Sequence, residues 1–416
     1  MALSVQTLFA LMVVPAVGGA LSSGPQCNAG CIPEHTKLKD GRVHCCTGGH
    51  ESLACPKPAH YRCGPTLPGS QLWVFEADTA LVRDPLLSAD SSTVYVDSGD
   101  SLYALNGSTG ITLWSVDFIK TNPTDIVECR LGLTTSRPNL SPLYYAMNVN
   151  DEMYIIDLLT GSTISSFLTN HVIASVPVLS TDSKVLYATG IDDNILAFDT
   201  FSGDILWTFT VGSWIPAAPL LGGGVVYVGS ADSTIYAVDA HTGIKLWAFA
   251  AAGPPLSTPV LSHNGGVLYT VTGGSCASDP NAKSTVYAVD AHTGSQIWSV
   301  YFNCSCELGA PVVNKDNTIV YAGGGDGVLY AVNASTGSTI WIFGADSAII
   351  ATPALGPSDR VLYITSSNAV LYAVNALTGA PRWSVQTVFN PKAVTSGTDN
   401  AAVYVIGGNS LQAIKA

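Results

Sequence analysis

The sequence predicts an all-β protein built as an eight-bladed β-propeller, and three observations carry this prediction. First, a strand–turn–strand unit, clearest over residues 235–247, recurs eight times after residue 67. Second, the copies follow one another at about 42 residues, a period typical of propeller blades with four strands each. Third, only 11% of the residues are charged and 40 are Gly, whereas charged residues make up roughly 25% of an average domain.

The repeated unit combines strand residues with a tight turn. Tyr236 and Val238 alternate with their neighbours as residues of a strand do. Asp239 can accept backbone hydrogen bonds from the turn that follows, and Gly243 supplies the positive φ that a tight hairpin requires. Trp247 is a large apolar residue on the return strand. Because one hairpin cannot bury both a Trp and a Tyr, the unit requires neighbouring copies.

The eight copies are identified by their turn glycines. These are Gly110, Gly161, Gly203, Gly243, Gly294, Gly337, Gly379 and Gly69, in the order of blades 1 to 8. In seven copies a Trp follows four residues later, and these residues are Trp73, Trp114, Trp207, Trp247, Trp298, Trp341 and Trp383. Ser165 takes this position in blade 2, so that copy is degenerate.

Each period also begins with a strand of small residues around a Pro, as in residues 217–221, 257–261, 309–313 and 351–355. Small side chains suit the crowded innermost strand of a blade. A Pro is tolerated there because an edge strand need not donate on its open side.

The two ends of the repeat region complement each other. Residues 68–73 have only the second half of the hairpin, and residues 402–414 stop where a turn glycine should follow. We therefore expect residues 69–76 to pair beside residues 409–415 and close the ring, which removes its open edges.

The repeats resemble the PQQ-like repeat of quinoprotein alcohol dehydrogenases and of outer-membrane-assembly lipoprotein propellers. The best copies are Tyr236-Ala-Val-Asp-Ala-His-Thr-Gly243, Tyr287-Ala-Val-Asp-Ala-His-Thr-Gly294 and Tyr330-Ala-Val-Asn-Ala-Ser-Thr-Gly337. The resemblance covers residues 68–416. It implies a propeller in which the repeat Trp docks between adjacent blades. It does not imply an activity, because many members of the family are not enzymes.

The N-terminal region divides into two parts. Residues 1–20 carry a short apolar run ending in Gly18-Gly-Ala20, which is typical of a cleaved signal peptide. The alternative, an uncleaved membrane anchor, is disfavoured because the apolar run is about ten residues and a span needs about 20. Residues 21–67 then form a six-cysteine, disulfide-rich module with a linker. We therefore expect a secreted, extracellular protein.

The cysteines of this module are Cys27, Cys31, Cys45, Cys46, Cys55 and Cys63. Six cysteines allow 15 pairings, so their connectivity stays open. Four histidines lie among them, which makes a zinc site the alternative, but an oxidising compartment favours disulfides.

Two of the periods are longer, and their extra residues lie at 116–142 and 272–284. The first is shared between the connector into blade 2 and that blade's first turn, and the second lies in the turn between the second and third strands of blade 5. Connectors and second-to-third-strand turns lie on one face of a propeller, so much of the extra length should decorate that face. Cys276 lies in the second insertion, and Cys304 and Cys306 lie in the loop after blade 5. We expect a disulfide between Cys276 and Cys304, with Cys306 as the alternative partner. Asn106, Asn139, Asn303 and Asn333 begin glycosylation sequons.

The resemblance to quinoprotein dehydrogenases implies where a cofactor would lie. These enzymes hold PQQ and calcium near the propeller axis with acidic and amide ligands, a floor Trp, an Asp base and often a disulfide between adjacent cysteines. The adjacent pair Cys45-Cys46 precedes the propeller, and no such ligand set can be matched residue by residue. The candidates for a ligand-binding face are Trp214, Glu128, His171 and Glu307, all in loops of the insertion-bearing face.

Two functional hypotheses follow. The first is a secreted, non-catalytic propeller that binds a protein or a glycan on its loop-rich face and needs no cofactor. The alternative is an extracellular dehydrogenase dependent on PQQ and calcium. The net charge of −13, without a Lys/Arg cluster, disfavours nucleic acid and anionic membranes as partners, and no stable membrane span is expected.

Overall fold

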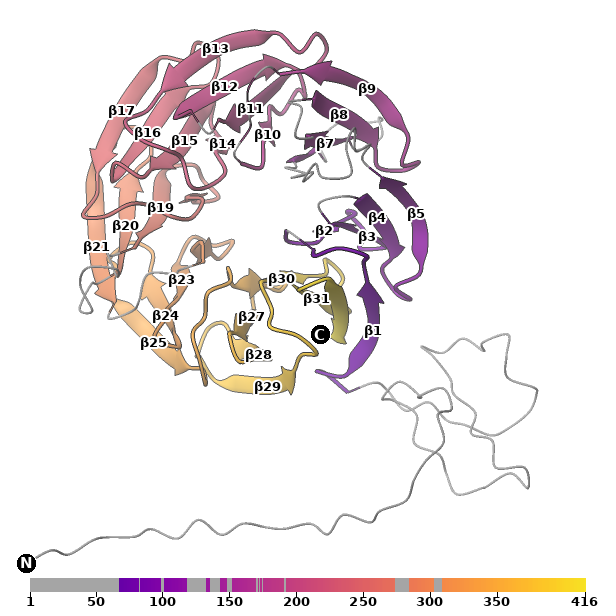
Figure 1. The fold of residues 1–416 in the computed structure, drawn as a ribbon. Helices are drawn as coiled ribbons and strands as arrows, with labels where there is room; N and C mark the ends of the chain where they lie inside the picture. Colours follow the sequence, from indigo (N-terminus) through magenta and orange to yellow (C-terminus); the bar gives the residue numbers. More distant parts are fainter. Residues whose placement is uncertain are drawn as a thin grey trace, which may run out of the picture.

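The structure is a computed structural model. It describes residues 67–81, 83–98, 101–117, 132–134, 143–147, 152–169, 171, 173, 175–190, 192–273, 284–302 and 309–416. These residues form eight four-stranded antiparallel sheets and no helix. The sheets are arranged as blades around a central axis (Figure 1). The prediction of an all-β, eight-bladed propeller is therefore confirmed.

Each of the first seven blades is a meander of four consecutive strands. Blade 1 contains β2 (Leu86–Leu87), β3 (Thr93–Asp97), β4 (Ser101–Asn106) and β5 (Thr112–Asp117). Blade 2 contains β6 (Gly132–Thr134), β7 (Leu143–Met147), β8 (Glu152–Asp157) and β9 (Thr163–Leu168). Blade 3 contains β10 (Val178–Leu179), β11 (Val185–Thr189), β12 (Asn194–Asp199) and β13 (Ile205–Thr210). Blade 4 contains β14 (Leu220–Gly222), β15 (Val225–Ser230), β16 (Thr234–Asp239) and β17 (Lys245–Ala250).

The remaining blades follow the same order until the last. Blade 5 contains β18 (Val260–Leu261), β19 (Val267–Thr272), β20 (Ser284–Asp290) and β21 (Gln296–Phe302). Blade 6 contains β22 (Val312–Val313), β23 (Ile319–Gly323), β24 (Val328–Asn333) and β25 (Thr339–Gly344). Blade 7 contains β26 (Ala354–Leu355), β27 (Val361–Ser366), β28 (Val370–Asn375) and β29 (Pro381–Gln386). Blade 8 joins β30 (Ala393–Ser396), β31 (Ala402–Gly407) and β32 (Ser410–Lys415) to the N-terminal β1 (Gln71–Glu76).

The ring closes as the sequence predicts. Strand β1 pairs antiparallel with β32, with Phe75 opposite Leu411. The pairing continues past the strand, because the Gly69 amide donates to the Lys415 carbonyl at 2.8 Å. Figure 1 shows β1 completing the last blade on its outer side.

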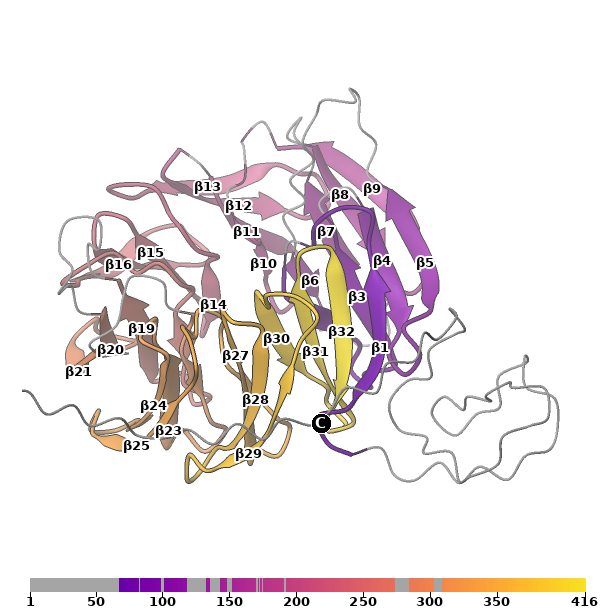
Figure 2. The same cartoon turned by 60° about the horizontal axis from the view of Figure 1, so that its bottom comes forward.

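The meander gives the ring two distinct faces. The turns between first and second strands and between third and fourth strands lie on one face, which we call the hairpin face. The turns between second and third strands and the connectors between blades lie on the other, the connector face. Figure 2 shows the ring from the side, with the strands of each blade running between the two faces.

The turn between third and fourth strands is built as expected. In blade 4 the Asp239 carboxylate accepts hydrogen bonds from the backbone amides of His241 and Thr242 at 3.1 and 2.8 Å. Gly243 closes the turn with a φ of 72°. The same arrangement recurs with Asn in blade 6, where Asn333 accepts from the amides of Ser335 and Thr336. A short polar side chain therefore satisfies the turn's amides in both blades.

The turn glycine has a second role, which is to receive the Trp of the preceding blade. A Cβ atom at Gly243 would lie 2.8 Å from the Trp207 ring, and one at Gly294 would lie 2.8 Å from Trp247. Glycine is thus required both by its φ and by the ring that covers it. The same contact joins Trp73 to Gly110, Trp114 to Gly161, Trp298 to Gly337, Trp341 to Gly379 and Trp383 to Gly69.

Blade 2 differs because Ser165 is exposed and does not cover Gly203. Phe167 takes this role, and a Cβ atom at Gly203 would lie 2.5 Å from its ring. Phe167 lies opposite Met153, as Phe249 lies opposite Ile235 in blade 4. The aromatic residue two positions after the repeat Trp therefore replaces the missing Trp.

A Tyr of the second strand joins the Trp at several of the interfaces between blades. In blade 4 the Tyr227 hydroxyl and the Trp247 Nε1 both donate to the carbonyl of Ala291 in blade 5, at 3.2 and 3.0 Å. Tyr187 and Trp207 share the Ala240 carbonyl in the same way, at 3.0 and 2.9 Å. The buried polar ends of both aromatic residues are thus satisfied by one backbone carbonyl.

The innermost strands are shorter than the sequence pattern suggests. Strands β14, β18, β22 and β26 start only after the Pro of each small-residue run. The small residues ahead of the Pro are required by crowding, because a Cβ atom at Gly309 would lie 2.5 Å from the Ala351 carbonyl carbon in the next blade. The Pro residues precede the short strands, where no ladder hydrogen bond is lost.

Several expectations lie outside the described residues. These are the signal peptide, the six-cysteine module with its zinc alternative, and all ten cysteines, including Cys276 and Cys304. Within the described residues, no helix is long and apolar enough to span a membrane.

Candidate functional site

Two of the four candidate residues, Trp214 and His171, lie in loops of the connector face. Trp214 belongs to the connector between blades 3 and 4, and His171 belongs to the connector between blades 2 and 3. Glu128 and Glu307 are outside the described residues. The structure thus places Trp214 and His171 on consecutive connectors of one face.

Trp214 is held by its backbone and presents its side chain to solvent. Its carbonyl accepts a hydrogen bond from the Ala231 amide at 2.9 Å, and the neighbouring Ser213 carbonyl accepts from the Ser230 hydroxyl at 2.9 Å. These bonds tie the connector to the turn between β15 and β16. The side chain nevertheless is 54% exposed. A large aromatic surface is therefore displayed on a fixed backbone.

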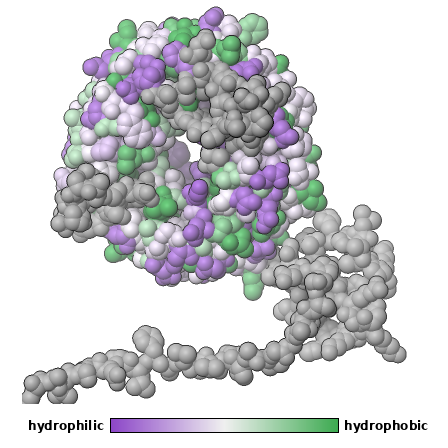
Figure 3. Space-filling view, in the orientation of Figure 1, coloured by the Kyte–Doolittle hydropathy of each residue, from purple (hydrophilic) through white to green (hydrophobic). Residues whose placement is uncertain are grey.

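Other exposed apolar residues lie on connectors of the same face. Leu256 lies on the connector between blades 4 and 5, and Val388 lies on the connector between blades 7 and 8. Figure 3 shows that hydrophobic and hydrophilic residues are interspersed around the central opening, without one continuous apolar patch. Exposed apolar residues that are scattered singly are normal on a protein surface.

His171 lies in a polar setting. Its Nδ1 is 3.5 Å from Asp192 Oδ2, and both side chains are partly exposed. The Thr169 hydroxyl donates to the His171 carbonyl at 2.9 Å and fixes the backbone there. An exposed pair of this kind contributes little to stability. Together with Trp214, it forms a polar and aromatic edge on neighbouring connectors.

Sequence reasoning missed a buried carboxylate in blade 1. Asp97, at the end of β3, is only 3% exposed, and its Oδ2 has no hydrogen-bond partner. Burial raises the pKa of Asp97 to about 7, although the nearby Arg83 guanidinium opposes this shift. Burial also raises the pKa of Asp84, again opposed by Arg83. The sequence signal was available, because equivalent positions carry uncharged residues such as Thr189 and Gly229.

A calcium site is the part of a quinoprotein centre that can be compared with the described residues. Calcium requires several oxygen ligands that converge on one point. Within the described part of the chain, no three His, Cys, Asp or Glu side chains are grouped closely enough to hold a metal ion. Asp84 and Asp97 alone do not make such a set, and Arg83 carries a positive charge beside them.

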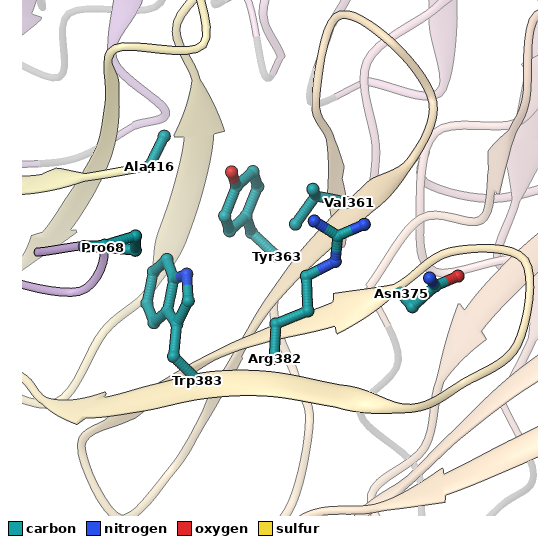
Figure 4. A pocket seen from close by; sticks show the side chains of 7 residues that line it. All are labelled: Pro68, Val361, Tyr363, Asn375, Arg382, Trp383 and Ala416. Carbon is teal, nitrogen blue, oxygen red and sulfur yellow. The ribbon is translucent and has the colours of Figure 1, made fainter.

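A cleft of about 430 Å³ lies between blades 7 and 8 near the hairpin face. We call it the seam cleft, since it lies where the first and last strands of the ring meet. It is lined by Pro68, Val361, Tyr363, Asn375, Arg382, Trp383 and Ala416. Figure 4 shows Arg382 and Trp383 projecting from β29, with Tyr363 between the guanidinium and Ala416. Sequence reasoning did not single out this site.

The fold and the interblade contacts define the class, an eight-bladed propeller of PQQ-like repeats. The chain belongs to the family described as outer membrane protein assembly factor BamB, whose sequence profile matches residues 149–278 and 282–414. The resemblance inferred from the Tyr-Ala-Val-Asp repeats is thereby confirmed.

Two solved structures share the fold at low sequence identity. The first is BamB from Moraxella catarrhalis, with 17% identity and a TM-score of 0.62, covering 84% of this chain and 100% of that one. The second is the computationally designed Ika8 protein, with 16% identity and a TM-score of 0.63, covering 82% of this chain and 98% of that one. No curated protein matches the chain.

Proposed function

We propose that this protein is a secreted, non-catalytic scaffold that binds a protein partner through its connector face. The observation that carries the proposal is Trp214, a 54% exposed Trp on a connector tied down by backbone hydrogen bonds. Exposed Trp residues are strongly enriched among the residues that dominate binding energy at protein interfaces. Binding residues commonly lie on loops that a rigid scaffold holds in position.

The family supports a protein partner. Its description names an assembly factor, and an assembly factor acts by contacting other proteins. Leu256, on the next connector, is a second exposed apolar residue that a partner could contact on this face. The paired His171 and Asp192 supply hydrogen-bonding groups at the edge of the same surface. Secretion rests on the apolar N-terminal run at residues 8–17.

The test compares two exposed aromatic residues on opposite faces. The tagged protein is incubated with the native extracellular fraction, and the captured proteins are identified by mass spectrometry. Trp214→Ala should lose the specific captures and should weaken binding of a purified captured partner at least roughly tenfold. Phe201→Ala is the matched control, because Phe201 is 98% exposed on the hairpin face of blade 3. It should retain the captures and the affinity.

Two results would redirect the proposal. If Phe201→Ala weakens binding as much as Trp214→Ala, the connector face is not the binding surface. If treatment of the extracellular fraction with glycosidases abolishes capture by the parent protein, the partner's glycan is what is recognised.

A further inference from the structure

The seam cleft lies at the interface between blades 7 and 8, where Tyr363 and Trp383 share no carbonyl acceptor among the described residues. Within the part of the chain that the structure describes, the Trp341 Nε1, at the interface between blades 6 and 7, also has no hydrogen-bond partner. At the interface between blades 4 and 5, Tyr227 and Trp247 both donate to the Ala291 carbonyl. At the seam, the equivalent residues are Tyr363 and Trp383, whose rings keep the usual tilted pairing at 5.9 Å. Their polar groups line the cleft instead.

The seam also differs from the other interfaces in its chain connection. In a regular blade, the third strand continues through a turn into the fourth, and the residue after the turn's Asp or Asn presents the shared carbonyl. In blade 8 the fourth strand is β1, and the position after Lys415 is held by Ala416. Within the described residues, neither the Tyr363 hydroxyl nor the Trp383 Nε1 donates a hydrogen bond to Ala416 or to any other acceptor.

Arg382 gives the cleft its charge. The seven other blades carry a Leu or Ile immediately before the position of the repeat Trp, and these are Leu72, Leu113, Ile164, Leu206, Leu246, Ile297 and Ile340. The Arg382 guanidinium donates one hydrogen bond, to the Arg360 carbonyl at 3.3 Å. No carboxylate lies within ion-pair distance of it in the described part of the chain.

Asn375 adds a further donor. Its Oδ1 already accepts hydrogen bonds from the backbone amides of Leu377 and Thr378, at 3.0 and 3.1 Å. Its amide nitrogen is therefore the group left to bind a ligand. Among the side chains of the cleft, the guanidinium, the phenol, the indole and this amide all offer protons. A complementary ligand must supply acceptors.

We propose that the seam cleft binds a small organic carboxylate that carries an apolar group. Arg382 offers the planar pair of N–H groups that matches a carboxylate, and Tyr363 and Trp383 add donors beside it. Val361, Pro68 and the Trp383 ring supply an apolar wall. The volume of about 430 Å³ suits a small molecule. A monoanion is favoured over a phosphate dianion because the chain's net charge is −13.

Such a ligand also bridges the closure of the ring. It contacts Tyr363, Arg382 and Trp383 of blade 7 on one side, and Pro68 and Ala416 of blade 8 on the other. Because it binds only when both blades are in place, it stabilises the folded ring by mass action. Binding should therefore raise the melting temperature as well as produce a calorimetric signal.

The test uses the full chain and phenylacetate, with phenylacetamide as the neutral isostere. Titration calorimetry should give one site with a Kd below about 1 mM for phenylacetate. Phenylacetamide should bind at least roughly tenfold more weakly, because the charge-assisted hydrogen bonds are lost. Equal binding of the two compounds, or no binding of phenylacetate, would overturn the proposal.

The variants separate the guanidinium from general charge. Arg382→Leu installs the residue type that the other blades carry, and it should weaken phenylacetate binding at least roughly tenfold. Lys245→Leu removes an exposed cation from the outer strand of blade 4 and should leave binding unchanged. Tyr363→Phe removes only the hydroxyl and should weaken binding severalfold, which keeps the proposal testable if Arg382→Leu folds poorly. Unchanged affinity in Arg382→Leu or Tyr363→Phe would contradict it.

Two further probes define the source of the carboxylate. N-acetylphenylalanine mimics the carboxyl terminus of a peptide, and its binding would show that the cleft accepts a peptide end as well as a free acid. If phenylacetate binds and N-acetylphenylalanine does not, the ligand is a free acid. Tighter binding of phenyl phosphate than of phenylacetate would overturn the assignment of a carboxylate.

Discussion

At the residue scale, the contact between a turn glycine and the aromatic ring of the preceding blade determines how blades stack. The glycine must adopt a positive φ and must lack a Cβ atom, and both requirements meet at Gly243. The Trp contributes burial and a hydrogen bond to a carbonyl of the neighbouring blade. Because the contact crosses between blades, each one stabilises the ring and not the blade alone.

The first prediction concerns these aromatic residues. Trp247 is 8% exposed, and Trp247→Ala should lower the free energy of unfolding by about 3–5 kcal/mol. Ser165→Ala, at the equivalent but exposed position of blade 2, should change it by less than about 0.5 kcal/mol. Phe167→Ala should be destabilising, because Phe167 covers Gly203. Urea unfolding measures all three, and similar losses at Trp247 and Ser165 would contradict the alignment of the repeats.

The second prediction concerns Asp97, whose pKa burial raises from 3.8 to about 7. An unfolded chain releases this proton near pH 4, whereas the folded chain holds it until near pH 7. The contribution of this group to stability is therefore fully present below about pH 4 and is lost as the pH rises to about 7. The total loss in the free energy of unfolding is roughly 4 kcal/mol. Asp97→Asn should remove this loss, so the variant should gain stability relative to the parent as the pH rises from 4 to 7.

Asp90 provides the control for Asp97. Hydrogen bonds from Ser88 and Ser92 lower its pKa to about 2. Its contribution is therefore present above about pH 4 and is lost only as the pH falls toward 2. Asp90→Asn should show no change in relative stability between pH 4 and pH 7. If the difference in stability between Asp97→Asn and the parent is also unchanged between pH 4 and pH 7, ionisation of Asp97 does not destabilise the fold and the prediction is wrong.

At the element scale, strand β1 is the only part of the described ring that joins a blade from a distant part of the sequence. It covers the edge of β32 from Gln71 to Glu76, with a shift in register between Gln71 and Trp73. It also carries Trp73, which is buried against Gly110 of blade 1. The strand therefore completes both blade 8 and its interface with blade 1.

The third prediction follows from this double role. Deletion of residues 68–76 should expose the edge of β32 and remove Trp73, lowering the melting temperature by roughly 10 °C or more. Glu76→Ala is the control, because Glu76 is an exposed residue of β1 and the change leaves the backbone ladder in place. It should shift the melting temperature by no more than about 2 °C. A deletion variant as stable as the parent would rule out this closure.

At the scale of the whole molecule, the ring separates two potential binding regions. The connector face displays Trp214, and the seam cleft lies toward the hairpin face. A closed propeller holds both in fixed positions, because every blade is packed between two others. Both proposed binding regions depend on single groups, Trp214 and Arg382, in a chain in which only 11% of the residues are charged.

The fourth prediction concerns the cofactor of the related dehydrogenases. The protein, incubated with PQQ and calcium, should show no calcium-dependent quinone binding and no dye-linked oxidation of alcohols. The reason is that the described residues offer no convergent set of metal ligands. A quinoprotein alcohol dehydrogenase reconstituted in parallel is the positive control. Tight binding with turnover would instead make Trp214 and Glu307 candidate residues of an active site.

Local residue patterns determined much of the architecture from the sequence alone. The turn glycines and the Asp or Asn four residues before them specify the hairpins, and their spacing specifies the number of blades. The complementary half-repeats at residues 68–73 and 402–414 specify the closure. These features are readable because each depends on neighbours in the chain, where turn chemistry and strand alternation act.

Contacts between blades were decided only by the tertiary structure. That Phe167 replaces the missing Trp follows from the space above Gly203. The seam cleft forms only in the closed ring, because Pro68 and Ala416, which line it, come from distant parts of the sequence. The burial of Asp97 likewise depends on tertiary packing. Such features depend on distances between residues remote in sequence, and the repeat period carries no information about them.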